Sequence, residues 1–232
     1  ITIANYEGPV TVPSAFLNTG DNVIAVELHQ NDTMTSDAVF GLIMTAESVV
    51  SDTSTQEALD LLNGLRITEL MYHPFNVGSL EFFELQNVGA VALDLSGVRM
   101  AEGVEFEFPS SMLAPGEVIL VVQDQMAFES LYGTGLNVAG EYGTGTQRFS
   151  FSNGGETVRL VDSLGRTVQQ FSYDDQAAWP IRADGHGSSL EIIDVNGNVD
   201  DPSNWRASVE FHGSPGVTGV GSMASVVINE VL

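Results

Sequence analysis

The sequence contains no cysteine and no lysine. The missing cysteine excludes disulfides, thiol catalysis and thiolate metal sites together. Every basic residue is an arginine, and the 7 arginines face 31 Asp and Glu, which gives a formal net charge of -24. Nucleic-acid affinity rests on Lys and Arg that displace counterions from phosphates, and an anionic membrane surface needs the same positive charge. We therefore expect no nucleic-acid partner.

Long apolar runs are also missing. The longest uncharged apolar stretch, Ala38–Ala46, is far shorter than the roughly 20 residues that span a bilayer. No transmembrane segment is expected. The first residues show neither an initiator Met nor the basic and apolar regions of a signal peptide, so we expect the chain to be a piece of a longer protein. An acidic, lysine-free surface suits a saline exterior, which predicts an extracellular or cell-surface location.

Strand patterns dominate the chain and predict an all-β fold. At Asn22–Gln30 apolar and polar residues alternate, as in a half-buried antiparallel strand. Val118–Val122 is apolar on both faces, which is typical of a central, doubly covered strand. Thr157–Val161 and Val168–Ser172 predict a hairpin whose connection contains Gly165. A short helix is expected at Gln125–Tyr132.

That helix carries capping residues at both ends. Asp124 is placed to cap its first turn, and Gly133 follows its last residue.

Composition predicts the domain boundaries. Ser51–Glu57 is polar and Gly213–Ser222 is rich in Gly and Ser, so both are expected to be linkers, the second a flexible one. The block between them has the usual size of one β-sandwich. After it, Val226–Leu232 reads VVINEVL, and its last five residues, Ile228–Leu232, overlay Ile67–Met71 of LRITELM. The tail is therefore expected to be the first strand of a truncated second copy.

The block between the linkers resembles the lamin tail domain, in the form that recurs in large bacterial surface proteins. The resemblance rests on a series of segments in the family's order: LRITELMYHP (65–74), EFFELQNVG (81–89), LDLSGVRM (93–100), FEFPSSMLAPGEVILVV (106–122), FSNGGETVRLVDSLGRTVQQFSYDD (151–175), WP (179–180), DGHGSSLEIID (184–194), DPSNWRAS (201–208) and GSPG (213–216). It implies an immunoglobulin-like β-sandwich.

The N-terminal region is similar to the end of a galactose-binding-type jelly roll, through VPSAFLNTGDNVIAVELHQ (12–30) and SDAVFGL (36–42). The expected organisation is thus a partial jelly roll over 1–50, a linker over 51–64, the lamin tail domain over 65–216, a linker over 217–224 and the second-copy strand over 225–232. Bacterial relatives of this kind are non-catalytic modules beside hydrolases and adhesive domains. Chromatin binding, which is associated with animal lamin tails, is not carried over because the basic residues are absent.

Three carboxylates on neighbouring predicted strands, Glu69, Glu81 and Glu84, invite comparison with a glycosidase pair. Alternation places Glu81 and Glu84 on opposite faces of one strand, so they cannot share a cleft without a bulge. Structural or solvated carboxylates are therefore the favoured interpretation.

Other catalytic patterns are missing. The four histidines, at 29, 73, 186 and 212, follow no metal-binding spacing, and the sequence around Ser188 lacks the nucleophile elbow. The phosphate-loop lysine is absent as well. We expect no enzymatic activity.

One segment has the spacing of a metal loop. Its oxygen-bearing residues recur at alternate positions, as in Ca²⁺ loops: Asp194, Asn196, Asn198, Asp200 and Asp201. The glycine and the final bidentate Glu of such a loop are out of place, and Trp205 stands where the Glu would be. The competing interpretation is a turn whose side chains cap backbone amides. Asp174, Asp175 and Asp184 are further oxygen donors nearby in sequence.

Trp179 and Trp205 could stack against sugars, but in a sandwich such residues more often close the core. The sequence therefore favours a non-enzymatic structural or adhesive module of a large bacterial surface or secreted protein, with a protein or glycan partner. The alternative is a carbohydrate-binding module attached to an extracellular hydrolase.

Overall fold

The computed structural model describes residues 53–142, 150–176 and 178–217. Within them the helices are α1 (Thr53–Gly64) and α2 (Gln125–Tyr132), with short 3-10 turns at Gly78–Leu80, Ile181–Ala183 and Pro202–Asn204. The strands are β1 (Leu65–Met71), β2 (Phe82–Asn87), β3 (Leu93–Asp94), β4 (Arg99–Glu102), β5 (Phe106–Glu107), β6 (Met112–Leu113), β7 (Val118–Val122), β8 (Val138–Glu141), β9 (Gly155–Val161), β10 (Thr167–Asp174), β11 (Leu190–Ile192) and β12 (Trp205–Ala207). The strand predicted at 22–30, the jelly-roll end and the second-copy strand lie outside the described residues.

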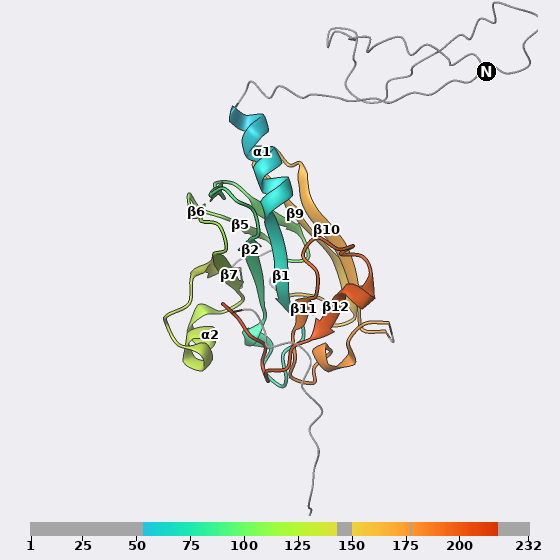
Figure 1. Cartoon of the computed structure of the whole chain (residues 1–232). Helices are drawn as coiled ribbons and strands as arrows, with labels where there is room; N and C mark the ends of the chain where they lie inside the picture. The colour runs from blue at the N-terminus through green and yellow to red at the C-terminus, as the bar shows by residue number, and fades with distance from the viewer. Residues whose placement is uncertain (1–52, 143–149, 177, 218–232) are drawn as a thin grey trace, which may run out of the picture. The chain divides into compact units, whose positions relative to one another are not determined.

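Two larger sheets form an immunoglobulin-like sandwich (Figure 1). The first has the order β12-β11-β1-β2-β7-β8 and the second the order β10-β9-β4-β5, while β3 and β6 pair separately. The main core lies between the sheets, where Ile67 and Phe83 of the first meet Leu160 and Phe171 of the second. The all-β prediction is confirmed, because alternating apolar residues fill one common interior.

The outer face of the six-stranded sheet has a second, smaller apolar cluster. Phe82 of β2 and Leu120 of β7 pack there against Phe128 of α2. Strand β7 is therefore covered on both faces, since Val121 lies in the main core and Leu120 in the outer cluster. This confirms the interpretation of Val118–Val122 as a central, doubly covered strand.

The local turn and cap predictions are confirmed. Strands β9 and β10 form the expected hairpin, and Gly165 in its connection has a φ of 80°, which a residue with a side chain rarely adopts. The Asp124 side chain accepts a hydrogen bond from the Ala127 amide at 2.9 Å, and Gly133 ends the helix with its amide donating to Glu129 O.

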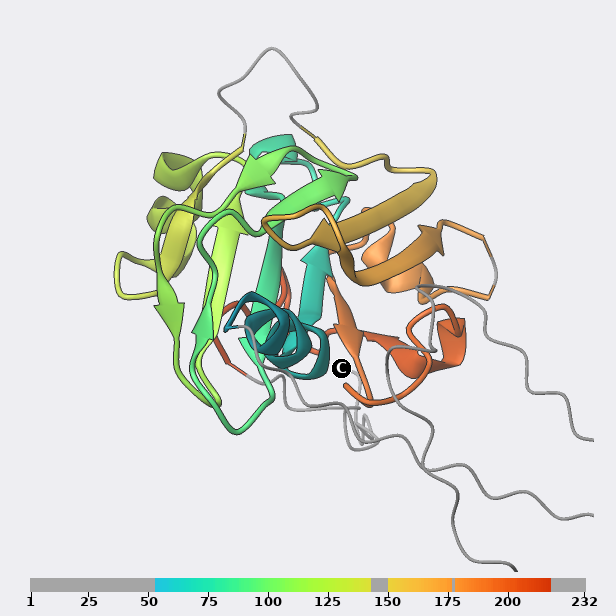
Figure 2. The ribbon, with the colours of Figure 1, turned by 90° about the horizontal axis from the view of Figure 1, so that it is seen from above.

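The predicted linker over 51–64 is wrong in its described part, because these residues form α1. Leu61 is buried in the main core, while its neighbour Leu62 is 47% exposed. Arg66 donates to the Leu62 and Asn63 carbonyls at the helix C-terminus, which satisfies acceptors that have no partner within the helix. The helix contacts β1, β3 and β10 at one end of the sandwich (Figures 1 and 2).

The prediction of a linker over 51–64 is wrong in its described part because it rested only on the polar first half of this segment. The second half, Ala58–Gly64, combines good helix formers with an Asn-Gly ending. Within the described residues no helix is both long and apolar enough to cross a membrane.

A buried carboxylate row as candidate functional site

Three glutamates stand side by side on the outer face of the six-stranded sheet. Glu69 of β1 is paired with Glu191 of β11 on one side and with Glu84 of β2 on the other. They are 2%, 4% and 4% exposed in that order. We call Glu191, Glu69 and Glu84 the carboxylate row. Arg206 of β12 continues it beyond Glu191, and Leu120 of β7 beyond Glu84.

A bulge in β1 places Glu69 in this row. Ile67 pairs with Leu85 and Glu69 with the adjacent Glu84, so Thr68 is the extra residue. Ile67 and Glu69 would share a face in a regular strand. Because of the bulge, Ile67 points into the main core and Glu69 points to the outer face. Without it, a carboxylate would enter the apolar core.

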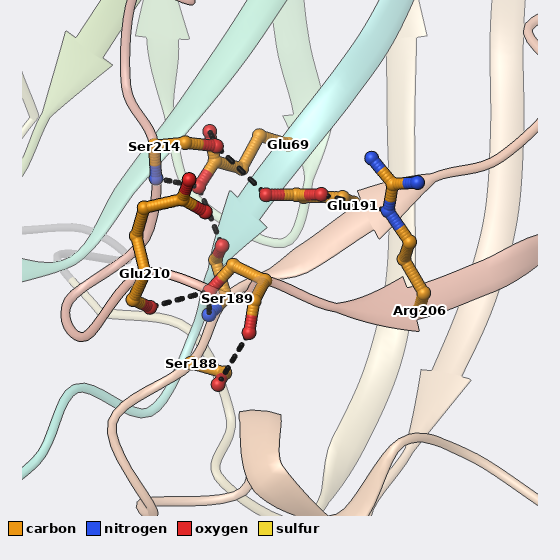
Figure 3. Close-up of polar contacts among 8 residues, drawn as sticks. Glu69, Ser188, Ser189, Glu191, Arg206, Glu210 and Ser214 are labelled. Carbon is orange, nitrogen blue, oxygen red and sulfur yellow. Dashed lines mark hydrogen bonds and ion pairs between the residues drawn. The ribbon is translucent and has the colours of Figure 1, made fainter. Parts of the chain in front are cut away.

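Glu69 is held by hydrogen bonds from two segments far away in sequence. Its Oε1 accepts from Ser189 Oγ at 2.5 Å and from the Ser214 amide at 2.8 Å. Its Oε2 lies 3.3 Å from Ser214 Oγ, which is also 2.7 Å from Glu191 Oε1 (Figure 3). Ser214 therefore bridges two members of the row.

The other two carboxylates have their own donors. Glu84 Oε1 accepts from Thr68 Oγ1 at 2.6 Å, and its Oε2 from the Gly216 amide at 2.7 Å. Glu191 Oε2 accepts from Arg206 Nε at 2.8 Å. Satisfied acceptors are the condition for keeping polar groups in a low-dielectric site.

The residues that cover the row are Gly213–Gly216, which we call the exit segment. Gly213, Ser214 and Pro215 are buried. The prediction of a flexible linker over Gly213–Ser222 is therefore wrong for these three residues. Gly213 has a φ of 89°, and a Cβ there would lie 2.5 Å from Glu69 Oε1. Only glycine fits this close approach. The exit segment is therefore fastened to the sheet by the row itself.

Burial dominates the electrostatics of the row. Desolvation, then the Glu84 charge, raises the pKa of Glu69 to about 8. Desolvation likewise raises the pKa of Glu84 to about 7 against the hydrogen bonds from Thr68 and Gly216. A charged carboxylate is disfavoured where water is excluded and a like charge is close. Glu69 and Glu84 thus have a raised proton affinity, although substrates from solution cannot reach side chains that are so deeply covered.

The comparison with known families places this sandwich. Residues 62–175 match the family model of the Lamin Tail Domain. Over this segment the chain is similar to the lamin tail domain. The match supports the resemblance drawn from sequence motifs and the non-catalytic immunoglobulin-like fold that the family has. No curated protein matches the chain.

The third glutamate considered from sequence lies apart from the row. Glu81, which directly precedes β2, accepts from the Phe151 amide at 2.8 Å and from Tyr142 Oη at 3.2 Å. Desolvation raises its pKa to about 8. Glu84 faces the exit segment instead, so the two do not form a pair across a cleft, as alternation along the strand predicts.

The buried serines and the described histidines of the sandwich form no nucleophilic site. Ser188 and Ser189 are fully buried, and their hydroxyls donate to Ser208 O and to Glu69. His73 Nδ1 lies 2.6 Å from Asp184 Oδ1, and no serine hydroxyl is bonded to that ring in the described contacts. His29 lies outside the described residues.

Four of the five predicted calcium ligands have a side-chain oxygen that accepts a hydrogen bond from a backbone amide. Asp194 Oδ1 accepts from the Asn196 amide, Asn198 Oδ1 from the Asp200 amide and Asp201 Oδ1 from the Ser203 amide. Asp200 Oδ1 accepts from the Ser172 amide on β10 at 3.3 Å. In the ranges that the structure describes, no group of three or more acidic or histidine side chains is placed to hold a metal ion. Calcium binding stays a prediction.

Both tryptophans lie inside the sandwich. Trp205 is 3% and Trp179 is 9% exposed. The Trp205 ring stacks on Phe171 with centroids 4.7 Å apart, and its Nε1 donates to Val199 O at 2.8 Å. Trp205 thereby joins the core to the loop that precedes it.

Sequence reasoning singled out Glu69 and Glu84 but missed Ser189, Glu191 and Ser214. A signal was present: in LRITELM, FFELQN and SSLEII a single Glu stands among mainly apolar strand residues. Such a Glu in a buried strand needs partners. What the sequence could not supply was the order in which the three strands pair.

Proposed function

We propose that this chain is a non-enzymatic structural and adhesive module of a larger multidomain bacterial protein, either secreted or bound to the cell surface. The lamin tail sandwich supplies a rigid body with an acidic surface. The proposal rests on the burial of the carboxylate row. Each of its three glutamates is at most 4% exposed and accepts hydrogen bonds from neighbouring residues of the same chain. Such groups stabilise a body and leave no accessible acid–base pair.

Partners follow from the same surface. With 7 basic residues against 31 acidic ones, phosphate-rich partners are disfavoured, and we propose a protein or glycan on a cell surface as the contact. Adhesion by such modules depends on repeated weak contacts, because linked modules gain avidity from their raised effective concentration.

The alternative, a carbohydrate-binding module attached to a hydrolase, has less support. Both tryptophan rings are buried, which leaves little ring face for a sugar. A hollow between α1 and the β9–β10 connection is lined by Ser54, Glu57, Ala58, Leu61, Asp94, Ser96, Asp162, Ser163, Leu164 and Arg166, none of them aromatic. A glycan would find no stacking platform in this lining.

Beads coated with the full chain test the proposal. We expect them to attach to protein-coated or cell surfaces more than beads coated with an unrelated protein of similar negative charge. The same preparation should turn over no chromogenic glycoside, ester or peptide. Selective retention of the chain on a glycan array, with no attachment to protein-coated surfaces, would favour the carbohydrate-binding alternative instead. Turnover that is lost on unfolding would refute the non-enzymatic part.

A further inference from the structure

Hydrogen-bond counting at Ser214 locates a proton in the carboxylate row. A serine hydroxyl has one proton to donate. Ser214 Oγ lies 2.7 Å from Glu191 Oε1 and 3.3 Å from Glu69 Oε2, so two acceptors compete for that proton. The shorter contact takes it. The contact to Glu69 is then a hydrogen bond only if Glu69 Oε2 is protonated and donates to Ser214 Oγ.

The surroundings of Glu69 favour this arrangement. Its neighbours in the row have both oxygens occupied: Glu84 accepts from Thr68 and Gly216, and Glu191 accepts from Ser214 Oγ and from its ion-pair partner Arg206. From α2, Tyr132 donates its hydroxyl to the backbone of His212 rather than to the row. A charge on Glu69 would thus stand between two carboxylates, with the row's one ion-paired arginine at its far end.

The loop before the exit segment adds two titratable groups to this region. Glu210 Oε2 and His212 Nδ1 are buried atoms without a hydrogen-bond partner. The Glu210 carbonyl accepts from Ser208 Oγ at 3.0 Å, and the His212 amide donates to Gly187 O at 2.6 Å. Neither of these two buried side-chain atoms is therefore bonded to Glu69.

We infer that the carboxylate row is a proton-dependent clasp, in which protonated Glu69 fastens the exit segment to the sheet and ionised Glu69 loosens it. The segment is attached at two amides, Ser214 to Glu69 and Gly216 to Glu84. Ionisation strengthens the single bond from the Ser214 amide, but it places like charges on Glu69 and Glu84 beneath the covering segment and removes the donor that Ser214 Oγ accepts from. Lifting the segment relieves both costs by admitting water. Burial, which raises the pKa of Glu69 to about 8, sets the change near neutral pH. This inference does not depend on the adhesive role.

Hydrogen exchange of the Ser214 and Gly216 amides in the full chain tests the clasp. Opening that releases a group with a raised pKa is favoured by up to about tenfold per pH unit between its open and closed pKa values. We expect the protection factors of both amides, corrected for intrinsic exchange, to fall by on the order of tenfold or more between pH 6 and pH 8.

Glu69→Gln is the diagnostic variant. Its amide nitrogen can take the place of protonated Oε2 and donate to Ser214 Oγ, while its oxygen accepts from Ser189 and Ser214 as before. Above about pH 7, where Glu84 is already ionised and only Glu69 would still titrate in the wild type, the protection factors should therefore stay flat. Glu81→Gln is the matched control: it removes another buried carboxylate, one that does not touch the exit segment, and should leave the wild-type fall unchanged.

Several outcomes would overturn the inference. These are a flat profile in the wild type, the wild-type slope in Glu69→Gln, or loss of the slope in Glu81→Gln. If Glu69→Gln does not fold, a carbon-13 titration of the Glu69 carboxyl in the wild-type chain decides. A midpoint well above the ordinary value of about 4.3 is expected, and an ordinary midpoint sinks the clasp.

Discussion

At the scale of single residues, buried side chains of the sandwich combine packing with a specific hydrogen bond. Trp205 stacks on Phe171 and also donates from Nε1 to Val199 O. Glu69 shows the polar version of the same arrangement. Both residues tie a connecting loop to the sheets, so their removal affects more than the cavity that they leave.

Trp205→Ala is therefore expected to lower the free energy of unfolding by about 3–5 kcal/mol, the usual range for a buried Trp or Phe. Urea denaturation measures the change. Ile181→Ala is the control, because Ile181 is 71% exposed; its effect should stay within about 0.5 kcal/mol. A stable Trp205→Ala variant that lost affinity for a glycan would contradict the core role and support the carbohydrate-binding alternative.

At the scale of elements, α1 is part of the sandwich rather than a tether. It runs directly into β1 and places Leu61 in the core that the two sheets share. Arg66 links the end of α1 to the candidate calcium loop, since its Nε donates to Val195 O at 3.0 Å. The helix and this loop are thus joined through one side chain.

Two adjacent leucines test the packing of α1. Leu61→Ala should cost about 2–5 kcal/mol, because Leu61 is 6% exposed, whereas Leu62→Ala should cost little, because Leu62 is 47% exposed. Both variants remove the same atoms from the same helix, so helix propensity cancels in the comparison. Equal losses in urea denaturation would show that α1 does not pack on the core in solution.

The loop Asp194–Asp201 is the second element with a testable role. Because its side-chain oxygens accept backbone amides, we expect Ca²⁺ and Mg²⁺ to give equal midpoints of thermal unfolding at matched ionic strength. A true calcium site would behave differently. Its stabilisation would be about 2.7 kcal/mol at a hundredfold excess over Kd, and Asp194→Ala or Asp200→Ala would abolish it.

At the scale of the whole molecule, the distribution of protons sets the pH dependence. Burial raises the pKa of Glu69 and Glu81 to about 8 and that of Glu84 to about 7, from 4.5. At pH values between the ordinary pKa of 4.5 and these raised pKa values, the folded chain holds more protons than the unfolded chain. Stability is therefore fully present below about pH 4.5 for these groups and is lost as the pH rises through about 7 to 8.

We accordingly expect the midpoint of thermal unfolding to fall between pH 5.5 and pH 8.5. Each kcal/mol lost lowers it by about 2–4 °C for a chain of this size. Measurement near 0.15 M salt screens the repulsion that a net charge of -24 adds. The double variant Glu69→Gln and Glu81→Gln should have a flatter profile. A midpoint that rose over this range would contradict the raised pKa values.

The sequence determined the features that depend on near neighbours. Asp124 and Gly133 bounded α2, Gly165 allowed the β9–β10 turn, and the apolar run Val118–Val122 indicated a strand covered on both faces. Caps, turns and alternation are local, because each is decided within a few residues. Motifs in series also indicated the lamin tail domain.

Only the tertiary structure decided the carboxylate row. Regular alternation would place Glu69 beside Ile67 in the core, and the bulge at Thr68 reverses it. Pairing of β1 with β11 then brings Ser189 and Glu191 to Glu69 across about half of the chain, and the exit segment closes over them. Strand order and a one-residue shift in register arise from the packing of the whole sheet, which no local pattern encodes.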